Sequence, residues 1–282
     1  MPQQQTMPLI NRRVDFTFDN VPSDWLADSI KTQFMQALSL FIPTSERMVI
    51  EILRTHLHRF HDKDNDQDIQ LLITDLIKQE GQHAAMHRRA NLAIVAQHPE
   101  LKWVEIIQTK CMGVIQKTNS DAFQLSIPVA FEHFTAAISK DVLINTNYWV
   151  GENPKNNTAV DFLLWHCLEE LEHQGACHVI YQDTYNHNFK NNTRIILSLL
   201  LLWLPLTSLS IFSVQFYLLM KDKTLLKPRN WLPFINFVGR TSLLFLNGVF
   251  KYQNKNRKTW NNKEIELYRS ACHNFNQRQS IS

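Results

Sequence analysis

Two stretches of the sequence decide the fold: QEGQHAAMH (residues 79–87) and WHCLEELEHQGACH (residues 165–178). Each holds a glutamate that is followed three positions later by a histidine. Residues three apart lie on the same face of an α-helix, so both side chains of such a pair can reach one metal ion. A single Glu-x-x-His motif often occurs by chance, but two of them within long helical patterns predict a helical metal centre. The two pairs are Glu80 with His83 and Glu170 with His173.

Two more glutamates lie inside apolar helical segments, in IPTSERMVIEIL (42–53) and in IPVAFEHFTAAI (127–138). Burying a carboxylate is costly unless it is paired or binds a metal. The order Glu, Glu-x-x-His, Glu, Glu-x-x-His matches four-helix bundles that hold two iron or manganese ions. The 48 residues between the first motif and the second single glutamate leave room for a crossover helix. We therefore predict an all-α, ferritin-like four-helix bundle with an additional apolar C-terminal helical region. Its six metal ligands would be Glu46, Glu80, His83, Glu132, Glu170 and His173.

Other titratable residues near these ligands have different expected roles. His87 and His166 lie one turn from a ligand on the inward face, where they would support a ligand or relay protons, or else be core histidines with hydrogen-bond partners. Glu169 and Glu172 flank Glu170 on other helix faces and are expected to be solvated. His133 points about 100° away from its neighbour Glu132 and is expected to make a surface or helix contact. His56, His58 and His61 of HLHRFH (56–61) are expected to be solvated.

The composition supports long helices and excludes several classes of protein. The 282 residues include only 6 glycines, far below the roughly 7% of average usage. No Gly-rich phosphate loop is present, which excludes P-loop and dinucleotide-binding fingerprints, and the HExxH motif of zinc proteases is absent. The 4 cysteines show no CxxC spacing, so we expect reduced thiols rather than a zinc ribbon. No apolar segment precedes the first charges, so no signal peptide is predicted and a cytoplasmic location is expected.

The chain divides into an irregular N-terminal arm (1–22), the bundle (23–190) and a C-terminal region (191–282). Residues 221–282 carry 12 Lys and Arg against 3 Asp and Glu, whereas residues 1–220 carry 17 against 23. Helices are expected over about 24–39, from Pro43 to Leu53, and over 68–96, 101–116, 121–147 and 158–184, with a loop at 151–157.

The C-terminal region contains two apolar runs. Residues 195–220 have no charged side chain, and 231–250 have only Arg240. A helix over the first run would reach about 39 Å, against about 30 Å for a bilayer core, although Pro205 and five Ser and Thr residues predict a kink or a hairpin. Three interpretations stay open: association with the inner membrane through 195–250, the wall of a substrate tunnel, and a homodimer interface. The basic tail suits anionic lipid headgroups, and no nucleic-acid-binding module is present.

These motifs resemble a bacterial family named predicted metal-dependent hydrolase, which has ferritin-like helical structure. The resemblance covers about Val14 to beyond Lys255, and Phe131 stands where the family pattern has Leu. It implies a metal-dependent enzyme. The segments that carry it are FIPTSE (41–46), QEGQHAAMHRR (79–89), FEHFTA (131–136) and WHCLEELEH (165–173).

Mixed carboxylate and imidazole donors suit iron or manganese better than a closed Cys-rich zinc site does. The main prediction is a non-haem di-iron or di-manganese enzyme that uses O2 and an electron donor to oxidise an apolar, acyl-chain substrate. One alternative is a hydrolase that uses metal-bound water, as the family name implies. Another is a ferroxidase or a metal-binding protein. One ion would be held by Glu46, Glu80 and His83, and the other by Glu132, Glu170 and His173.

Overall fold

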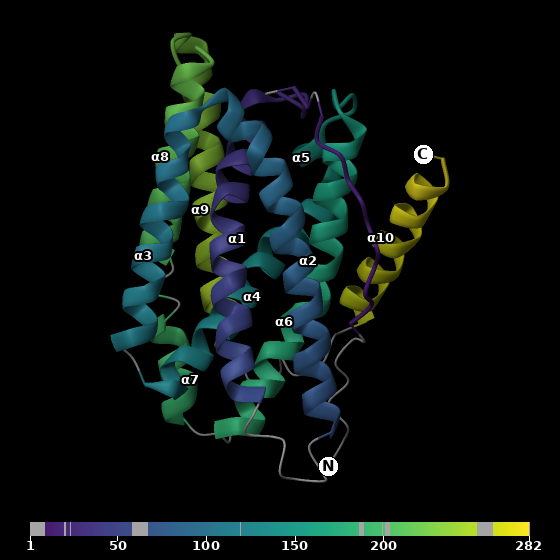
Figure 1. Ribbon diagram of the computed structural model, residues 1–282. Coiled ribbons are helices and arrows are strands. Elements are labelled where there is room, and N and C mark those ends of the chain that lie inside the picture. The colour runs from purple at the N-terminus through teal and green to yellow at the C-terminus, as the bar shows by residue number, and fades with distance from the viewer. Residues whose placement is uncertain are drawn as a thin grey trace.

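The computed structural model of the protein describes residues 9–19, 21–22, 24–57, 67–118, 120–185, 189–198, 200, 204–252 and 262–281. All regular elements in these ranges are helices, which confirms the all-α class. Four long helices carry the predicted ligands: α1 (Ser29–Leu57), α2 (Gln67–Gln97), α4 (Asp121–Ile144) and α6 (Asn157–Tyr185). α1 and α6 each pack against both α2 and α4, so the four helices close a ring (Figure 1). The finer ferritin-like topology stays a prediction.

The other helices surround this ring. The short η2 (Pro99–Leu101) leads into α3 (Lys102–Thr118), which packs on α1 and joins α2 to α4, as a crossover helix would. On the opposite side of the molecule α10 packs against α6 (Figure 1). α5 follows α4, α7 and α9 pack on α4, and α8 packs on α1. The bounds are α5 (Thr146–Val150), α7 (Phe189–Ser198), α8 (Leu204–Lys221), η4 (Pro228–Asn230), α9 (Trp231–Tyr252) and α10 (Asn262–Ile281).

The expectation that a separate helix starts at Pro43 is wrong, because α1 continues through it. A proline in a helix has no N–H to donate to the carbonyl four residues earlier, which here is that of Ser39. Nδ2 of Asn91 on α2 donates to that carbonyl oxygen at 2.8 Å instead. A neighbouring helix therefore supplies the missing hydrogen bond, and the two expected segments form one helix of 29 residues.

The predicted ligands lie between two apolar clusters. Along α1, the residues from Ile30 to Phe41 belong to one cluster and those from Met48 to Leu53 to the other, with Glu46 between them. The same alternation holds on α4, where Leu125 to Phe131 precede Glu132 and Ile138 and Val142 follow it, and on α6 around Glu170. Apolar packing on both sides excludes water and strengthens every electrostatic interaction in the layer between.

The charge-free run at 195–220 is shared between two helices, since α7 ends at Ser198 and α8 begins at Leu204. Among the described residues no helix has both the length and the apolar character needed to cross a membrane. The one charge in the second run is neutralised within the fold, because Nη2 of Arg240 on α9 donates to Oδ2 of Asp141 on α4 at 2.6 Å.

Apolar side chains are exposed along α3, α8 and α9, including Trp103 at 63%, Leu209 at 70% and Leu232 at 67%. The turn from α8 to α9 carries four basic residues, Lys221, Lys223, Lys227 and Arg229. Association with a membrane surface and dimerisation through this face stay predictions.

Candidate metal centre

All six predicted ligand residues meet in the centre of the helix ring, where each is at most 1% exposed. We call this set the Glu/His cluster. α1 contributes Glu46, α2 contributes Glu80 and His83, α4 contributes Glu132, and α6 contributes Glu170 and His173.

Both histidines of the cluster turn Nδ1 towards carboxylates. Nδ1 of His173 lies 2.8 Å from Oε1 of Glu80 and 3.2 Å from Oε2 of Glu132. Nδ1 of His83 lies 3.4 Å from Oε1 of Glu170, and Oε1 of Glu170 is also 3.8 Å from Nδ1 of His173. Glu170 therefore stands between the two histidines, in the position that suits a bridging ligand. The sequence predicts that Glu80 shares a metal ion with His83 of its own motif. In the structure Glu80 lies beside His173 instead.

Several carboxylate oxygens of the cluster have no hydrogen-bond partner among the described residues. They are both oxygens of Glu46, Oε2 of Glu80, Oε1 of Glu132 and Oε2 of Glu170, and all of them are buried. Buried polar atoms in folded proteins are almost always satisfied, and buried charges are paired or coordinate metals. Donor atoms from Glu80, His83, Glu170 and His173 all lie within 4.8 Å of one another. The donor set thus fits metal ions, which would supply the missing positive charge.

The outer nitrogen of each cluster histidine contacts an acceptor. Nε2 of His83 donates to Oε2 of Glu169 at 3.0 Å, and Nε2 of His173 donates to Oε1 of Gln79 at 3.0 Å. When the ring is neutral, a proton on Nε2 leaves the lone pair on Nδ1, which faces the carboxylates. This is the arrangement by which proteins fix the tautomer and the orientation of a metal-binding histidine.

The expectation that Glu169 and Glu172 are solvated is wrong, since their exposed fractions are 0% and 1%. Nη2 of Arg12, in the N-terminal arm, donates to Oε1 of Glu172 at 2.7 Å, and Nη1 lies 3.4 Å from Oε1 of Glu169. The hydroxyl of Tyr268 on α10 also donates to Glu172, at 2.7 Å. Amide Nε2 of Gln79 donates to Oε2 of Glu172 at 3.1 Å. The arm and α10 therefore hold the acceptors that orient both cluster histidines.

The sequence of α6 itself carries a signal for this burial. Leu168, Leu171 and Ala176 surround these acids on the other faces of α6, so the helix is apolar nearly all round. A helix of that kind is buried on all sides, and its charged residues then need partners.

The electrostatics of the cluster favour protons or cations. Burial raises the pKa of Glu46 well above its ordinary value, and the charges of Glu80 and Glu170 raise it further. Burial and the same two neighbours raise the pKa of Glu132 in the same way. Burial alone would lower the pKa of His83, but its hydrogen bonds with Glu169 and Glu170 and the charge of Glu169 together outweigh this and raise the pKa to about 9. Metal ions that bind here would displace protons.

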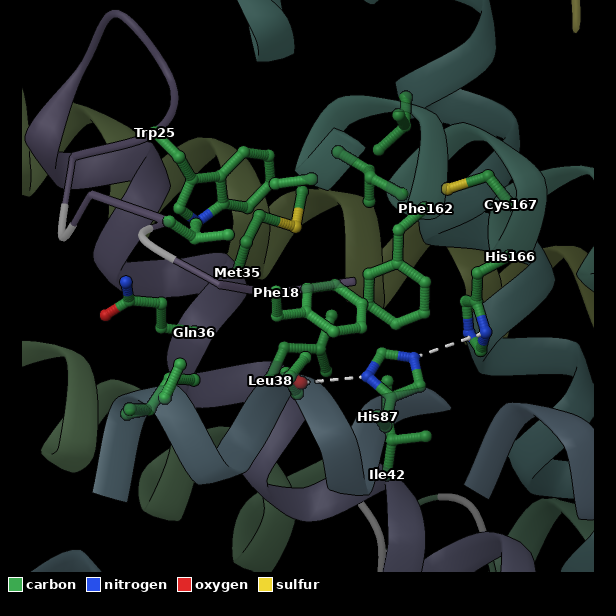
Figure 2. Close-up of a pocket in the computed structure, with 18 of the residues that line it drawn as sticks. Phe18, Trp25, Met35, Gln36, Leu38, Ile42, His87, Phe162, His166 and Cys167 are labelled. Atoms are coloured by element: carbon green, nitrogen blue, oxygen red, sulfur yellow. Dashed lines mark hydrogen bonds between the residues drawn. The ribbon is translucent and has the colours of Figure 1, made fainter. Parts of the chain in front are cut away.

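A hydrogen-bonded chain adjoins the cluster on one side (Figure 2). Because Nδ2 of Asn91 donates to the carbonyl of Ser39, Oδ1 of Asn91 accepts from the Ser39 hydroxyl, at 2.7 Å. Nδ1–H of His87 then donates to that hydroxyl oxygen at 2.8 Å, and Nε2 of His87 accepts from Nδ1–H of His166 at 3.3 Å. This leaves Nε2 of His166 unprotonated, 3.4 Å from Oε1 of Glu170. Two acceptors that face each other need a proton or a cation between them.

Burial lowers the pKa of both His87 and His166 well below the ordinary histidine value, and the charge on nearby His83 lowers it further. Both rings are therefore neutral at pH 7. The sequence places them beside the ligands, and the structure agrees. A ring nitrogen of His166 also lies within 4.8 Å of donor atoms of Glu46, His83 and Glu170.

The remaining histidines lie away from the cluster. His133 is buried and its Nε2 donates to the carbonyl of Gly248 on α9 at 2.8 Å, so the expected helix contact is confirmed. His56 is 1% exposed and its Nδ1 donates to the carbonyl of Ile52, so its expected solvation is wrong. His58 and His61 lie outside the described residues.

Comparison with known proteins agrees with this donor set. Residues 10–261 of the chain match the family described as predicted metal-dependent hydrolase. The chain belongs to this family. The matched segment includes the whole Glu/His cluster and Arg12, and it confirms the resemblance seen in the motifs. No curated protein and no solved structure matches the chain. Membership in this family thus rests on the sequence, and the buried Glu/His cluster could hold the metal that the family description implies.

Proposed function

We propose that this member of the predicted metal-dependent hydrolases binds two divalent metal ions in its Glu/His cluster and hydrolyses an organic substrate beside them. The unsatisfied oxygens of Glu46, Glu132 and Glu170 carry this proposal, because four buried carboxylates in one layer repel one another unless cations lie among them. Glu46 and His83 would hold one ion, Glu80, Glu132 and His173 the other, and Glu170 would bind both. Ions in such a site polarise a carbonyl or phosphoryl oxygen and lower the pKa of bound water.

Side chains next to the cluster would accept a proton and keep the accepting ring in its orientation. Nε2 of His166 carries the lone pair that faces the cluster, and it can take a proton from water that attacks the substrate. Nδ1–H of His166 is held by His87, which in turn is held by Ser39 and Asn91, so the ring keeps its orientation. The two apolar clusters on either side of the Glu/His cluster exclude bulk water from it.

Oxidation by O2 is a second candidate, and one observation favours it. The cluster offers carboxylate and imidazole donors and no thiolate, because the nearest cysteines of the core are buried thiols and burial raises the pKa of Cys167 to about 12. Such a donor set suits iron and manganese. A ferroxidase would use the same donors, and it would turn over Fe(II) without an organic substrate.

Metal content, measured by mass spectrometry on protein purified without oxygen, tests the proposal. We expect about two ions per chain, following the template of dinuclear bundles, and a loss of at least one ion in Glu132→Gln. Glu51→Gln is the matched control, since Glu51 is an exposed glutamate of α1. The absence of metal from the wild-type protein, and no uptake of Mn²⁺, Fe²⁺ or Zn²⁺, would refute the site.

The reaction is tested on the loaded protein with p-nitrophenyl esters in an oxygen electrode cell. Hydrolysis predicts metal-dependent release of p-nitrophenol with no uptake of O2, and a large loss of kcat in His166→Gln with metal content retained. Uptake of O2 that depends on an organic substrate would establish the oxidation candidate instead. Uptake driven by Fe(II) alone would establish the ferroxidase.

A further inference from the structure

A cavity of about 90 Å³ lies inside the ring of helices. Its wall is formed by α1, α2, α4 and α6 together with the segment that precedes α1, and Figure 2 shows Trp25, Met35, Phe18 and Phe162 around it. Most of the lining is apolar. His87 and His166 stand together at one side, and the hydrogen bond between them is visible in Figure 2.

The cavity continues the Glu/His cluster along the bundle. On each of the four helices, a residue that lines the cavity is three or four positions from a residue of the cluster, which is one helical turn. Four independent helices therefore place the cavity and the cluster in the same order along the bundle axis. The four pairs are Ile42 with Glu46, His87 with His83, Thr135 with Glu132, and His166 with Glu170.

The cavity is also elongated, and its lining changes from polar to apolar along its length. On α2 its lining extends from His87 to Gln97, about 15 Å along a helix that rises about 1.5 Å per residue. Its inner end carries the polar His166, its middle is lined by Met35, Ile138 and Phe162, and Gln97 at the far end is exposed. A ligand that matches this gradient has a polar group at the cluster and an apolar chain that points away from it.

We infer that the cavity binds the unbranched acyl chain of the substrate, with the bond to be cleaved held at His166. This assignment of substrate class rests on the proposed hydrolase function. A cavity of about 150 Å³ accommodates a six-carbon ring, so by proportion this one encloses about four carbon atoms. A longer chain would extend towards Gln97 at the exposed end. A branched chain would need the packed aromatic wall to move, which is costly in a close-packed interior.

Binding is measured on metal-free protein with two uncharged probes, butyramide and the branched trimethylacetamide. The methyl signals of 13C-labelled methionine provide the readout, because Met35 lines the cavity while Met112 lines a separate apolar groove between α3 and α8. Met35→Leu assigns the reporting signal. We expect butyramide to shift the Met35 signal and leave that of Met112 in place, with binding at least about tenfold tighter than that of trimethylacetamide, the ratio that one misfitting methyl group produces.

Filling the cavity provides the second arm of the test. Ala93 and Ala90 are half-buried residues of α2 that line it, and Ala85 is an exposed alanine of the same helix. Ala93→Leu should weaken butyramide binding about tenfold and lower kcat/KM for p-nitrophenyl butyrate by a similar factor, while p-nitrophenyl acetate changes far less. Ala90→Leu serves if Ala93→Leu does not fold, and Ala85→Leu should match the wild type.

The outcomes separate this inference from the proposed function. A Met35 shift in a protein that takes up no metal would keep the cavity as a chain-binding site and refute the hydrolase. Metal-dependent hydrolysis without a shift of the Met35 signal would keep the hydrolase and overturn the acyl-chain assignment. Equal binding of butyramide and trimethylacetamide would do the same. A shift of Met112 alone would also overturn it, because it would place the chain in the groove between α3 and α8.

Discussion

Nε2 of His83 lies 3.0 Å from Oε2 of Glu169, on the side of the ring opposite the nitrogen that faces Glu170. Glu169 is itself held by the indole Nε1 of Trp165, which donates to Oε1 at 3.0 Å. A carboxylate that is fixed in this way sets the tautomer of His83 and makes Nδ1 a better donor to a metal ion. The cluster histidines are thus aligned by residues that do not belong to the cluster.

Glu169→Gln should weaken the binding of one metal ion about tenfold or more, because an amide is a poorer acceptor than a carboxylate for the Nε2 proton of His83. Titration of metal-free protein with Mn²⁺, followed by calorimetry, would show one weakened and one unchanged site. Glu51→Gln, at an exposed position of α1, should leave both sites intact. Equal affinities in Glu169→Gln and the wild type would exclude this role.

Gln79→Leu should weaken the other ion by a similar factor of about ten, since it removes the acceptor for Nε2 of His173. Gln82 offers a matched comparison on the same helix, because its Nε2 donates to the carbonyl of Arg12 at 2.8 Å and does not contact the cluster. Gln82→Leu should cost about 1 kcal/mol of stability and leave both affinities unchanged. If the two variants bind metal alike, Gln79 does not orient His173.

Arg12→Ala should lower the free energy of unfolding by about 3 kcal/mol, the cost of leaving a buried charge without its partner. Arg12 is the cation that faces both Glu169 and Glu172, and its side chain is 13% exposed. Urea unfolding measures the change. Arg13→Ala, at the exposed neighbouring position, should change stability by less than about 0.5 kcal/mol. Similar losses in both variants would mean that the arm as a whole matters, and not this ion pair.

The residues of the Glu/His cluster could be predicted because their geometry is local. The spacing of Glu80 from His83 and of Glu170 from His173 fixes a shared helix face whatever the rest of the chain does. The apolar residues around Glu46 and Glu132 likewise indicate burial within a few positions. The order of the four segments then sufficed to predict that they meet, and the structure brings them together.

The parts that escaped prediction depend on partners far away in the sequence. Glu169 and Glu172 are buried because Arg12 reaches them from 157 and 160 residues earlier, and helix periodicity cannot show such a contact. Pro43 stays within a helix because Asn91 of another helix hydrogen-bonds the carbonyl that the proline leaves free. The placement of Glu80 beside His173 depends in the same way on how α2 packs against α6.

Removal of metal should make stability fall as pH rises from 7 to 9. In the metal-free protein, burial raises the pKa of Glu46 and Glu132 well above the ordinary value of 4.5, and His83 has a pKa of about 9 against 6.5 when unfolded. Between pH 7 and 9 the folded protein therefore retains protons that the unfolded chain has released, so unfolding becomes more favourable with rising pH. His83 alone would contribute about 2 kcal/mol over this range.

His87 and His166 do not oppose this trend, because their pKa values are lowered and both are neutral above pH 7 in either state. Bound metal ions would already have displaced the protons of the cluster, so the loaded protein should keep its stability over the same range. Urea unfolding at pH 7, 8 and 9, with and without a chelator, measures the difference. Glu46→Gln should reduce the pH dependence of the chelated protein without abolishing it, because the amide does not titrate while His83 and Glu132 still do. A chelated wild-type protein with constant stability from pH 7 to 9 would show that the cluster does not hold these protons.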